Sequence, residues 1–266
     1  MRTIPSDKHA LRLYDVAALS KTMYECRNPG VAEIAVVIPL YNYAHTILGV
    51  LESVVKQDCR KLSVVVIDDG SSDDGAAKAI QFLKAHPKRF VHAQVVRHKR
   101  NQGLSMTRNS GVALTSEPFL FMLDADNKLR PPALSRLLEA IHLSGAEFAY
   151  SQLRYIGESN GFGTADIWLP EQLTHGNYID AMALLRRTAL LAIGGYRGLA
   201  DDHGWEDYDL WCSFADHGFS GVFLPEALSE YTVHSASMLR ARTNNYADDL
   251  IAEMTLRHPM LFAKRR

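Results

Sequence analysis

Two aspartates separated by one residue, Asp124 and Asp126, are the clearest candidates for chemistry in this sequence. Carboxylate oxygens are the ligands that hard divalent cations prefer, and a cation with a diphosphate would offset the repulsion between two such close charges. The apolar run at residues 119–123 is typical of a buried strand, so both acids would follow its carboxyl end. Taken alone, the Asp-x-Asp pattern fits equally well with a capped turn before the helix that begins at Pro131-Pro132.

Two further groups of polar residues follow apolar runs in the same way. Pro39, Tyr41 and Asn42 come at the end of a run that starts at Ile34, and Asp68-Asp69-Gly70-Ser71 ends a run that starts at Leu62. Ligands of open α/β sheets bind outside the carboxyl ends of the strands, so the three tails are predicted to line one pocket that holds four carboxylates. An alternative for Asp68 and Asp69 is an Asx turn that caps the next helix, and both interpretations can hold together.

Candidates outside these tails are one arginine, a pair of acids and one histidine. Arg108 falls one to two turns into a predicted helix, where it would offset the acids or bind phosphate, unless it is a solvated surface residue. Glu206 and Asp207 lie beside large aromatic residues; one of them would be a general base, or both would simply suit the dipole of a first helical turn. His234 ends the last predicted strand, and a lone histidine is more often a satisfied polar residue than a metal ligand.

The elements that must position these residues alternate regularly in the first half of the chain. Periodicity predicts the order β-α-β-α-β-α-β, with strands at residues 34–39, 62–67, 90–96 and 118–123 and helices near 47–55, 76–85 and 104–114. Such alternation predicts a mostly parallel central sheet with helices on both faces, built from right-handed crossovers.

The remaining segments are less regular. We expect helices at residues 6–25, 131–143, 179–193 and 245–257, strands at 147–153, 221–224 and 228–233, and a long functional loop at 157–176. The helix at the start of the chain would be an appendage that ends where Asn28-Pro29-Gly30 breaks it.

Composition excludes several classes of protein. The 266 residues are 47% hydrophobic with a formal net charge of −1, which favours one compact domain with decorations and offers no basic stripe for nucleic acid. Three cysteines without a CxxC spacing argue against a disulfide framework or a zinc site and fit a reducing compartment. Without an apolar run of about 18 residues, we expect a cytoplasmic protein with no transmembrane segment. The basic end at residues 264–266 leaves peripheral contact with an anionic membrane open, although such short clusters are usually just solvated.

Six motifs in order resemble the family 2 glycosyltransferases, which have the GT-A fold. They are VVIPLYN, VIDDGSSDD, NQGLSMTRNSG, FMLDADN, GGYRG with GWEDYDLW, and YTVHSASM. The resemblance covers residues 33–238 and implies a Rossmann-like, mostly parallel sheet with a smaller acceptor-side region. It divides the chain into an N-terminal helical appendage (1–30), a glycosyltransferase domain (31–240) and a C-terminal helical tail (241–266). Within the domain, residues 31–130 would be the nucleotide-binding half and residues 131–240 the acceptor and catalytic half.

The resemblance also implies roles for single residues. Pro39, Tyr41 and Asp69 would contact the nucleoside, with Asp69 at the base. Asp124 would face the ribose, and Asp126 would hold Mg²⁺ or Mn²⁺, which His234 would help to bind as it closes over the diphosphate. Asp207 would be the catalytic base, oriented by Glu206. The other positions expected on the nucleotide-sugar side are Asn42, Asp68, Gly103, Arg108 and Ala125.

The implied reaction is a single displacement with inversion at the anomeric carbon. The donor would be a nucleotide-diphosphate sugar, with UDP as the first choice, and the acceptor a hydroxyl of a saccharide, a lipid-linked sugar or another molecule. Residues 157–178, with Trp168 and Gly176-Asn177-Tyr178, would cover the donor sugar and the acceptor.

Three other functions compete with this one. A sugar-phosphate nucleotidyltransferase would share the sheet and the acidic site, but no early Gly-rich basic loop is present to hold a triphosphate. A dinucleotide-dependent dehydrogenase is disfavoured because Gly161-Phe162-Gly163 lacks the third glycine, and Asp166 stands in its place. A non-catalytic sugar-nucleotide binding module would bind metal and donor without turnover, and it would usually lose Asp207, which is present here.

Overall fold

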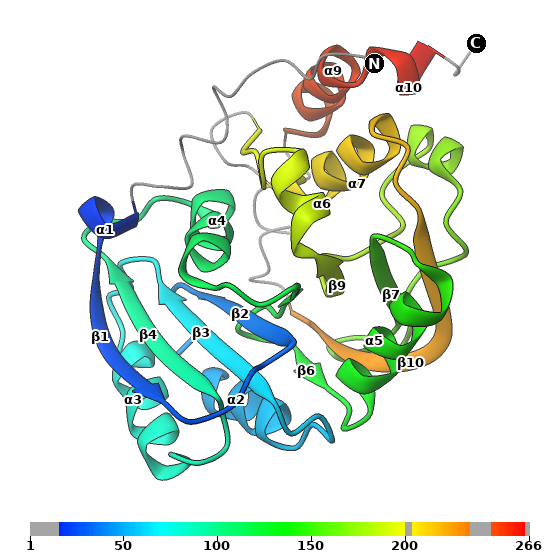
Figure 1. Cartoon of the computed structure of the whole chain (residues 1–266). Coiled ribbons are helices and arrows are strands. Elements are labelled where there is room, and N and C mark those ends of the chain that lie inside the picture. Colours follow the sequence, from blue (N-terminus) through cyan, green and yellow to red (C-terminus); the bar gives the residue numbers. More distant parts are fainter. Residues whose placement is uncertain (1–15, 200–203, 235–245, 264–266) are drawn as a thin grey trace.

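The computed structural model describes residues 16–199, 204–234 and 246–263. Within these ranges the strands form one ten-stranded sheet in the order β1-β4-β3-β2-β5-β9-β7-β10-β6, with β8 paired to β7 (Figure 1). The early part of the predicted N-terminal helix, Asn245 and the basic residues 264–266 lie outside the described residues.

The first half of the sheet has the predicted parallel arrangement. Strands β2, β3, β4 and β5 run parallel, and all seven residues of β2 and of β3 are buried, as expected for strands covered on both faces. This half consists of β2 (Ile34–Leu40), α2 (Ile47–Val55), β3 (Leu62–Asp68), α3 (Gly75–Ala85), β4 (His92–His98), α4 (Leu104–Leu114) and β5 (Phe119–Met122).

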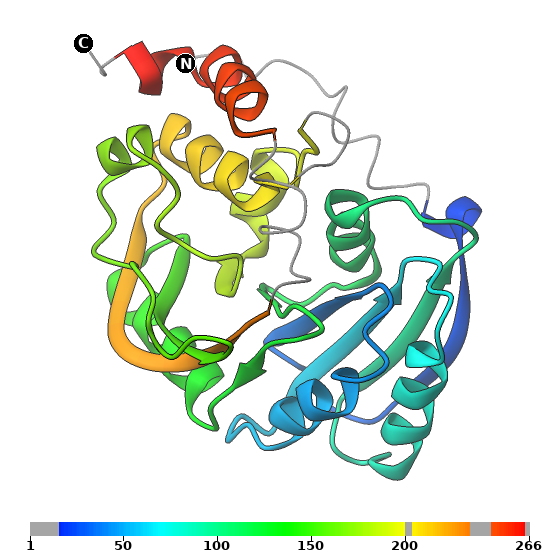
Figure 2. The same ribbon diagram turned by 180° about the vertical axis from the view of Figure 1, so that it is seen from behind.

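Helices cover both faces of the sheet. One apolar core lies between the sheet and α2, α3 and α5 (Ala133–Ser144), and a second lies between the opposite face and α4, α6 (Arg187–Ala192), α7 (Glu206–Asp216) and α9 (Ala247–Arg257). Helices α2 and α3 lie on the near side of the sheet in Figure 2, whereas α4 lies toward the other face. Helix α4 approaches β2 so closely that a Cβ at Gly111 would come within 2.2 Å of a Val37 methyl carbon. This packing fixes the height of α4, and with it Arg108, over the strand ends.

The predicted N-terminal helix is wrong from Ser20 onward. After one short helix, α1 (Val16–Leu19), the chain forms strand β1 (Ser20–Arg27), which pairs antiparallel with β4 at the edge of the sheet. The weak helical periodicity of this segment competes with a free sheet edge, and hydrogen bonding along β4 outweighs it. The segment is therefore part of the sheet rather than a helical appendage.

The predicted helix at 179–193 is wrong in its first half. Ala183–Arg186 is strand β9, which lies between β5 and β7 (Phe148–Gly157) and runs antiparallel to both. A short apolar run fits a buried strand and a buried helix equally, and the open side of β5 decides between them. Only α6 remains helical.

The last predicted strands form a single element. Strand β10 (Gly221–Val233) pairs parallel with β7 along its length, and its register shifts around Ala227. These irregularities bend the strand so that Ser229 and Glu230 pair with the two-residue β6 (Lys128–Leu129), next to the DADN segment. The other described elements are β8 (Gly161–Phe162), the 3₁₀ helix η2 (Pro170–Thr174) and α10 (Pro259–Phe262). No helix in the described ranges is both long and apolar enough to span a bilayer.

Candidate active site

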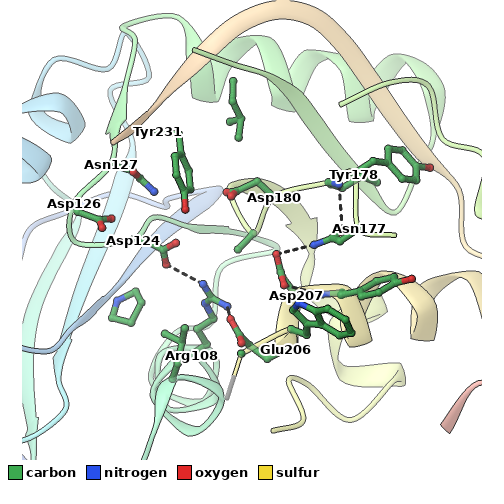
Figure 3. A pocket seen from close by; sticks show the side chains of 18 of the residues that line it. Arg108, Asp124, Asp126, Asn127, Asn177, Tyr178, Asp180, Glu206, Asp207 and Tyr231 are labelled. Carbon is green, nitrogen blue, oxygen red and sulfur yellow. Dashed lines mark hydrogen bonds and ion pairs between the residues drawn. The ribbon is translucent and has the colours of Figure 1, made fainter. Parts of the chain in front are cut away.

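A pocket of about 900 Å³ opens at the carboxyl ends of β2, β3 and β5, where the sequence predicts it. Residues of the segment 174–181, the first turn of α7 and the end of β10 close its other side. Figure 3 shows the side chains that converge there from these separate elements. Of the residues predicted on the nucleotide-sugar side, those that line the pocket are Pro39, Tyr41, Asp69, Gly103, Arg108, Asp124, Ala125 and Asp126.

Asp69 is held by three hydrogen bonds at the end of β3. Its Oδ1 accepts from the Gln102 backbone N–H at 2.8 Å and pairs with His98 Nδ1 at 2.6 Å, and its Oδ2 accepts from the Gly103 N–H at 2.9 Å. Gly103 has φ 87°, a conformation that costs little only for glycine. The bonds to the Gln102 and Gly103 N–H groups fix the loop before α4. A carboxylate has about four acceptor positions, so Asp69 can accept from about one further donor.

The prediction that Asp68 and Asn42 face the pocket is wrong, because neither residue lines it. Asp68 is fully buried, pairs with Arg97 at 2.6 Å and accepts from the Ser71 N–H at 3.0 Å. Asn42 accepts hydrogen bonds from the N–H and hydroxyl of Ser72. Both residues therefore brace the loops after β2 and β3, and three of the four predicted strand-end carboxylates line the pocket. Asp68 does not form the predicted Asx turn that caps the next helix, because it accepts from an N–H three residues on and the first N–H of α3 is bonded by Asp73 instead.

Arg108 joins the two halves of the pocket. Its side chain is buried and donates to Asp124 at 2.8 Å and to Glu206. The prediction that this guanidinium offsets the acids is confirmed, and the solvated alternative is wrong. Nearby Asp124 and Glu206 keep Arg108 charged by raising its pKa against the effect of burial.

Asp126 and His234 lie next to each other at the carboxyl end of β10. His234 Nε2 lies 3.0 Å from Asp126 Oδ2, and the Asn127 side chain accepts from the Thr232 N–H at 2.8 Å, which ties the DADN segment to the strand. Burial, and then the charge of Asp124, raise the pKa of Asp126. Two carboxylates and an imidazole fit a hard divalent cation in donor type. No group of three such side chains in the described part of the chain is already arranged around one point.

Asp207 enters the pocket from the first turn of α7. The turn follows Trp205, whose φ of 61° is rare for a bulky residue and directs the chain into the helix. Asp207 Oδ2 accepts a hydrogen bond from Asn177 Nδ2 at 3.0 Å, whereas Glu206 is turned toward Arg108 (Figure 3). Part of the Asp207 side chain faces the open pocket, but protein encloses its other sides. This burial, with the charges of Glu206 and Asp180, raises the pKa of Asp207 to about 8.

The other acid of this turn, Asp209, points away from the pocket, as helical geometry predicts. It is buried and accepts hydrogen bonds from Arg197 at 2.9 Å and 3.0 Å and from His258 Nε2 at 3.1 Å. His258 Nδ1 also lies 2.6 Å from Asp216. These ion pairs connect α7 to the segment between α9 and α10 and hold the helix that carries Asp207.

Residues 35–202 match the family described as Glycosyl transferase family 2, which is well over half of the chain. The chain belongs to glycosyl transferase family 2. Among its relatives, the succinoglycan biosynthesis protein ExoO of Rhizobium meliloti (strain 1021) is 30% identical over 160 residues, which are 59% of this chain and 44% of ExoO. The chain thus spans less than half the length of this relative.

Two solved structures have the same fold as this chain. Staphylococcus aureus TarS 1-349, in complex with UDP-GlcNAc, superposes with a TM-score of 0.69 at 18% identity and covers 84% of this chain and 66% of that one. The mannosyltransferase PcManGT of Pyrobaculum calidifontis, with GDP-Man and Mn²⁺, gives 0.66 at 16% identity over 96% of this chain and 75% of that one. The predicted GT-A fold is confirmed.

No individual role was predicted from the sequence for Asp180 or Asn177, although both line the pocket. Asp180 lines the pocket just before β9, and burial, with the charge of Asp124, raises its pKa to about 7. Asn177 was expected only to lie over the substrates, within a longer segment. The available signal for Asp180 was a single acid that interrupts an otherwise apolar run from Tyr178 to Leu185.

Proposed function

We propose that this family 2 glycosyltransferase transfers a sugar from a nucleotide-diphosphate sugar to an acceptor hydroxyl with inversion of configuration. UDP is the first nucleotide to test, and the acceptor is a saccharide, a lipid-linked sugar or another hydroxyl compound. The observation that carries the proposal is the position of Asp207, a carboxylate hydrogen-bonded by Asn177 at 3.0 Å that faces the same pocket as Asp124 and Asp126.

The base is Asp207 in its ionised form. It takes the proton from the acceptor hydroxyl as that oxygen forms its bond to the anomeric carbon and the bond from that carbon to the diphosphate breaks. Asn177 is the residue that orients the carboxylate, because its amide donates to Oδ2 while its own Oδ1 accepts from the Ile179 N–H at 3.2 Å. Glu206 was predicted to orient Asp207. In this proposal it instead pairs with Arg108 and holds that guanidinium in place.

Asp69, Pro39 and Tyr41 form the nucleoside end of the site. The acceptor capacity that remains on Asp69 suits an imide N–H of a uracil base. Support for UDP comes from TarS, solved with UDP-GlcNAc.

The residues proposed to hold a divalent cation are Asp126 and His234, with Asp124 beside them. Such a cation, Mg²⁺ or Mn²⁺, would neutralise the charge that develops on the departing diphosphate. PcManGT, solved with GDP-Man and Mn²⁺, supports a metal in this fold. Asp126→Asn should weaken Mn²⁺ binding, measured by titration calorimetry without any sugar donor.

A donor screen tests the proposed activity. Purified protein is incubated with UDP-, GDP- and dTDP-sugars with Mn²⁺ and then with a chelator, and release of the nucleoside diphosphate is measured. We expect release from one nucleotide class and loss of release with the chelator. In a parallel incubation with a sugar phosphate and a nucleoside triphosphate, formation of diphosphate and a nucleotide sugar would instead identify a nucleotidyltransferase. Donor binding with no turnover and no acceptor transfer would identify a binding module.

A further inference from the structure

Asp180 is a pocket carboxylate that none of these roles uses. Its Oδ1 accepts from the Met182 N–H at 2.9 Å, which fixes the carboxyl group at the start of β9. Figure 3 shows the other side of the group turned toward the interior, between Asp124 and Asn177 and facing Tyr231. The residue lines the pocket with these neighbours.

Asp180 lies between the two proposed halves of the reaction. Figure 3 shows Asp124 and Asp126 on one side of Asp180 and Asp207 on the other, and the charges of Asp124 and Asp207 are both close enough to interact with that of Asp180. In a displacement at an anomeric carbon, the sugar ring lies between the departing diphosphate and the attacking hydroxyl. A group midway between the residues proposed for these two partners therefore faces the sugar.

We propose that Asp180 accepts a hydrogen bond from a hydroxyl group of the donor sugar and thereby selects the sugar, an inference that rests on the proposed function. An ionised carboxylate only accepts hydrogen bonds, and a sugar hydroxyl is a matching donor. A partly buried carboxylate that loses its partner keeps the cost of desolvation, so donors without that hydroxyl are rejected. The arrangement makes Asp180 a specificity determinant and not a second base, because Asp207 already has the acceptor-side position.

A role in bracing the loop through the Met182 N–H is the alternative. Asp180→Asn distinguishes the sugar contact from the loop-bracing role. The amide oxygen of asparagine can still accept from the Met182 N–H, but the side chain no longer carries a negative charge. Asp180→Ala removes both. Asp166→Asn is the matched control, because Asp166 is an exposed acid of the preceding loop that accepts from the N–H of Ile167 and does not line the pocket.

The experiment measures dissociation constants for the free nucleoside diphosphate, for its sugar conjugate and for a series of mono-deoxy sugar conjugates. We expect the affinity that the sugar adds to fall about 10- to 100-fold in Asp180→Ala, the loss typical of a hydrogen bond to a charged group, and less in Asp180→Asn. Binding of the nucleoside diphosphate itself should remain unchanged, as should all values for Asp166→Asn.

The deoxy series identifies the hydroxyl. One deoxy donor should bind more weakly to the wild-type protein but not to Asp180→Ala, since the two changes remove the same contact. If every deoxy donor lost affinity equally in both proteins, the assignment of Asp180 would be overturned while the proposed function stood. If no sugar added affinity or turnover in the wild-type protein, both proposals would be overturned.

Discussion

Asp69 at the end of β3 and Asp207 in the first turn of α7 line the same pocket, but their oxygens are held differently. Asp69 is nine-tenths or more buried and accepts from two backbone N–H groups and pairs with His98. Asp207 has one side-chain donor, Asn177, one bond from the N–H of Tyr208, and two acids acting on it. Hydrogen bonds to the charged form stabilise it, whereas like charges and burial oppose it.

The different hydrogen bonding suits Asp69 to holding a ligand and Asp207 to transferring a proton. A carboxylate that backbone N–H groups hold in place is rigid, which suits recognition of a nucleotide. A carboxylate with a pKa near 8 exchanges its proton near neutral pH, which suits general base catalysis. Arg108 connects the two sides, because it pairs with Asp124 on one and Glu206 on the other.

The largest effect is expected for Asp207→Asn. Because the amide cannot take the acceptor proton, the transfer rate should fall about 10²- to 10⁴-fold, the range typical of a lost general base. Donor affinity should change little. Steady-state kinetics with both substrates and donor titration check the two parts separately, and full transferase activity in this variant would remove Asp207 from the mechanism.

A smaller effect is expected for Asn177→Ala. Loss of the amide that donates to Asp207 should reduce kcat about tenfold, the value of one hydrogen bond to a charged group, with KM for the donor nearly constant. The same loss should raise the pKa of Asp207 and so move the acidic, ascending limb of the pH–rate profile to higher pH, because the Asn177 amide favours the ionised carboxylate. Glu171→Ala, an exposed change in η2 outside the pocket, is the control. A uniform fall in rate without any shift of the profile would point to a structural role alone.

The smallest effect concerns stability. The folded-state pKa of Asp207 is about 8, above the usual 3.8, so the folded protein holds this proton more tightly than the unfolded chain does. Ionisation of Asp207 therefore destabilises the fold increasingly as the pH rises from about 4, and the penalty levels off above about pH 8. Asp207→Asn removes it, so the variant's Tm should exceed that of the wild-type protein by a few °C at pH 8, on the order of 2–4 °C per kcal/mol, and by less at pH 5. Equal Tm differences at the two pH values would contradict the raised pKa.

The parallel half of the fold was predictable because local patterns there agree with the tertiary structure. Helix α4 has the predicted bounds, and β2 and β3 extend one residue beyond theirs. Strands β1 and β9 were not predictable, because each is defined by pairing with a distant strand edge and its own sequence favours that pairing weakly.

The same distinction applies to the site. Order along the chain predicted that Asp69, Asp124 and Asp126 share a pocket, since the carboxyl ends of parallel strands meet at one edge, whereas the role of Asp207 was implied only by the family resemblance. It did not predict that Asp68 turns inward to Arg97, because the direction of this side chain at the end of β3 depends on a partner 29 residues away. Asp180 was missed for a related reason, since its place in the pocket follows from β9, which was predicted as a helix.

The most direct test asks whether Asp69 serves donor binding and Asp207 serves proton transfer. It measures the donor Kd and the transfer rate at saturating donor for both Asp69→Asn and Asp207→Asn. Asp69→Asn places an amide against the N–H groups of Gln102 and Gly103, so the donor Kd should rise about tenfold or more while transfer from bound donor persists. Asp207→Asn should show the reverse, with donor Kd near the wild-type value and transfer lost. Loss of donor affinity and of transfer to the same extent in both variants would contradict separate roles for the two carboxylates.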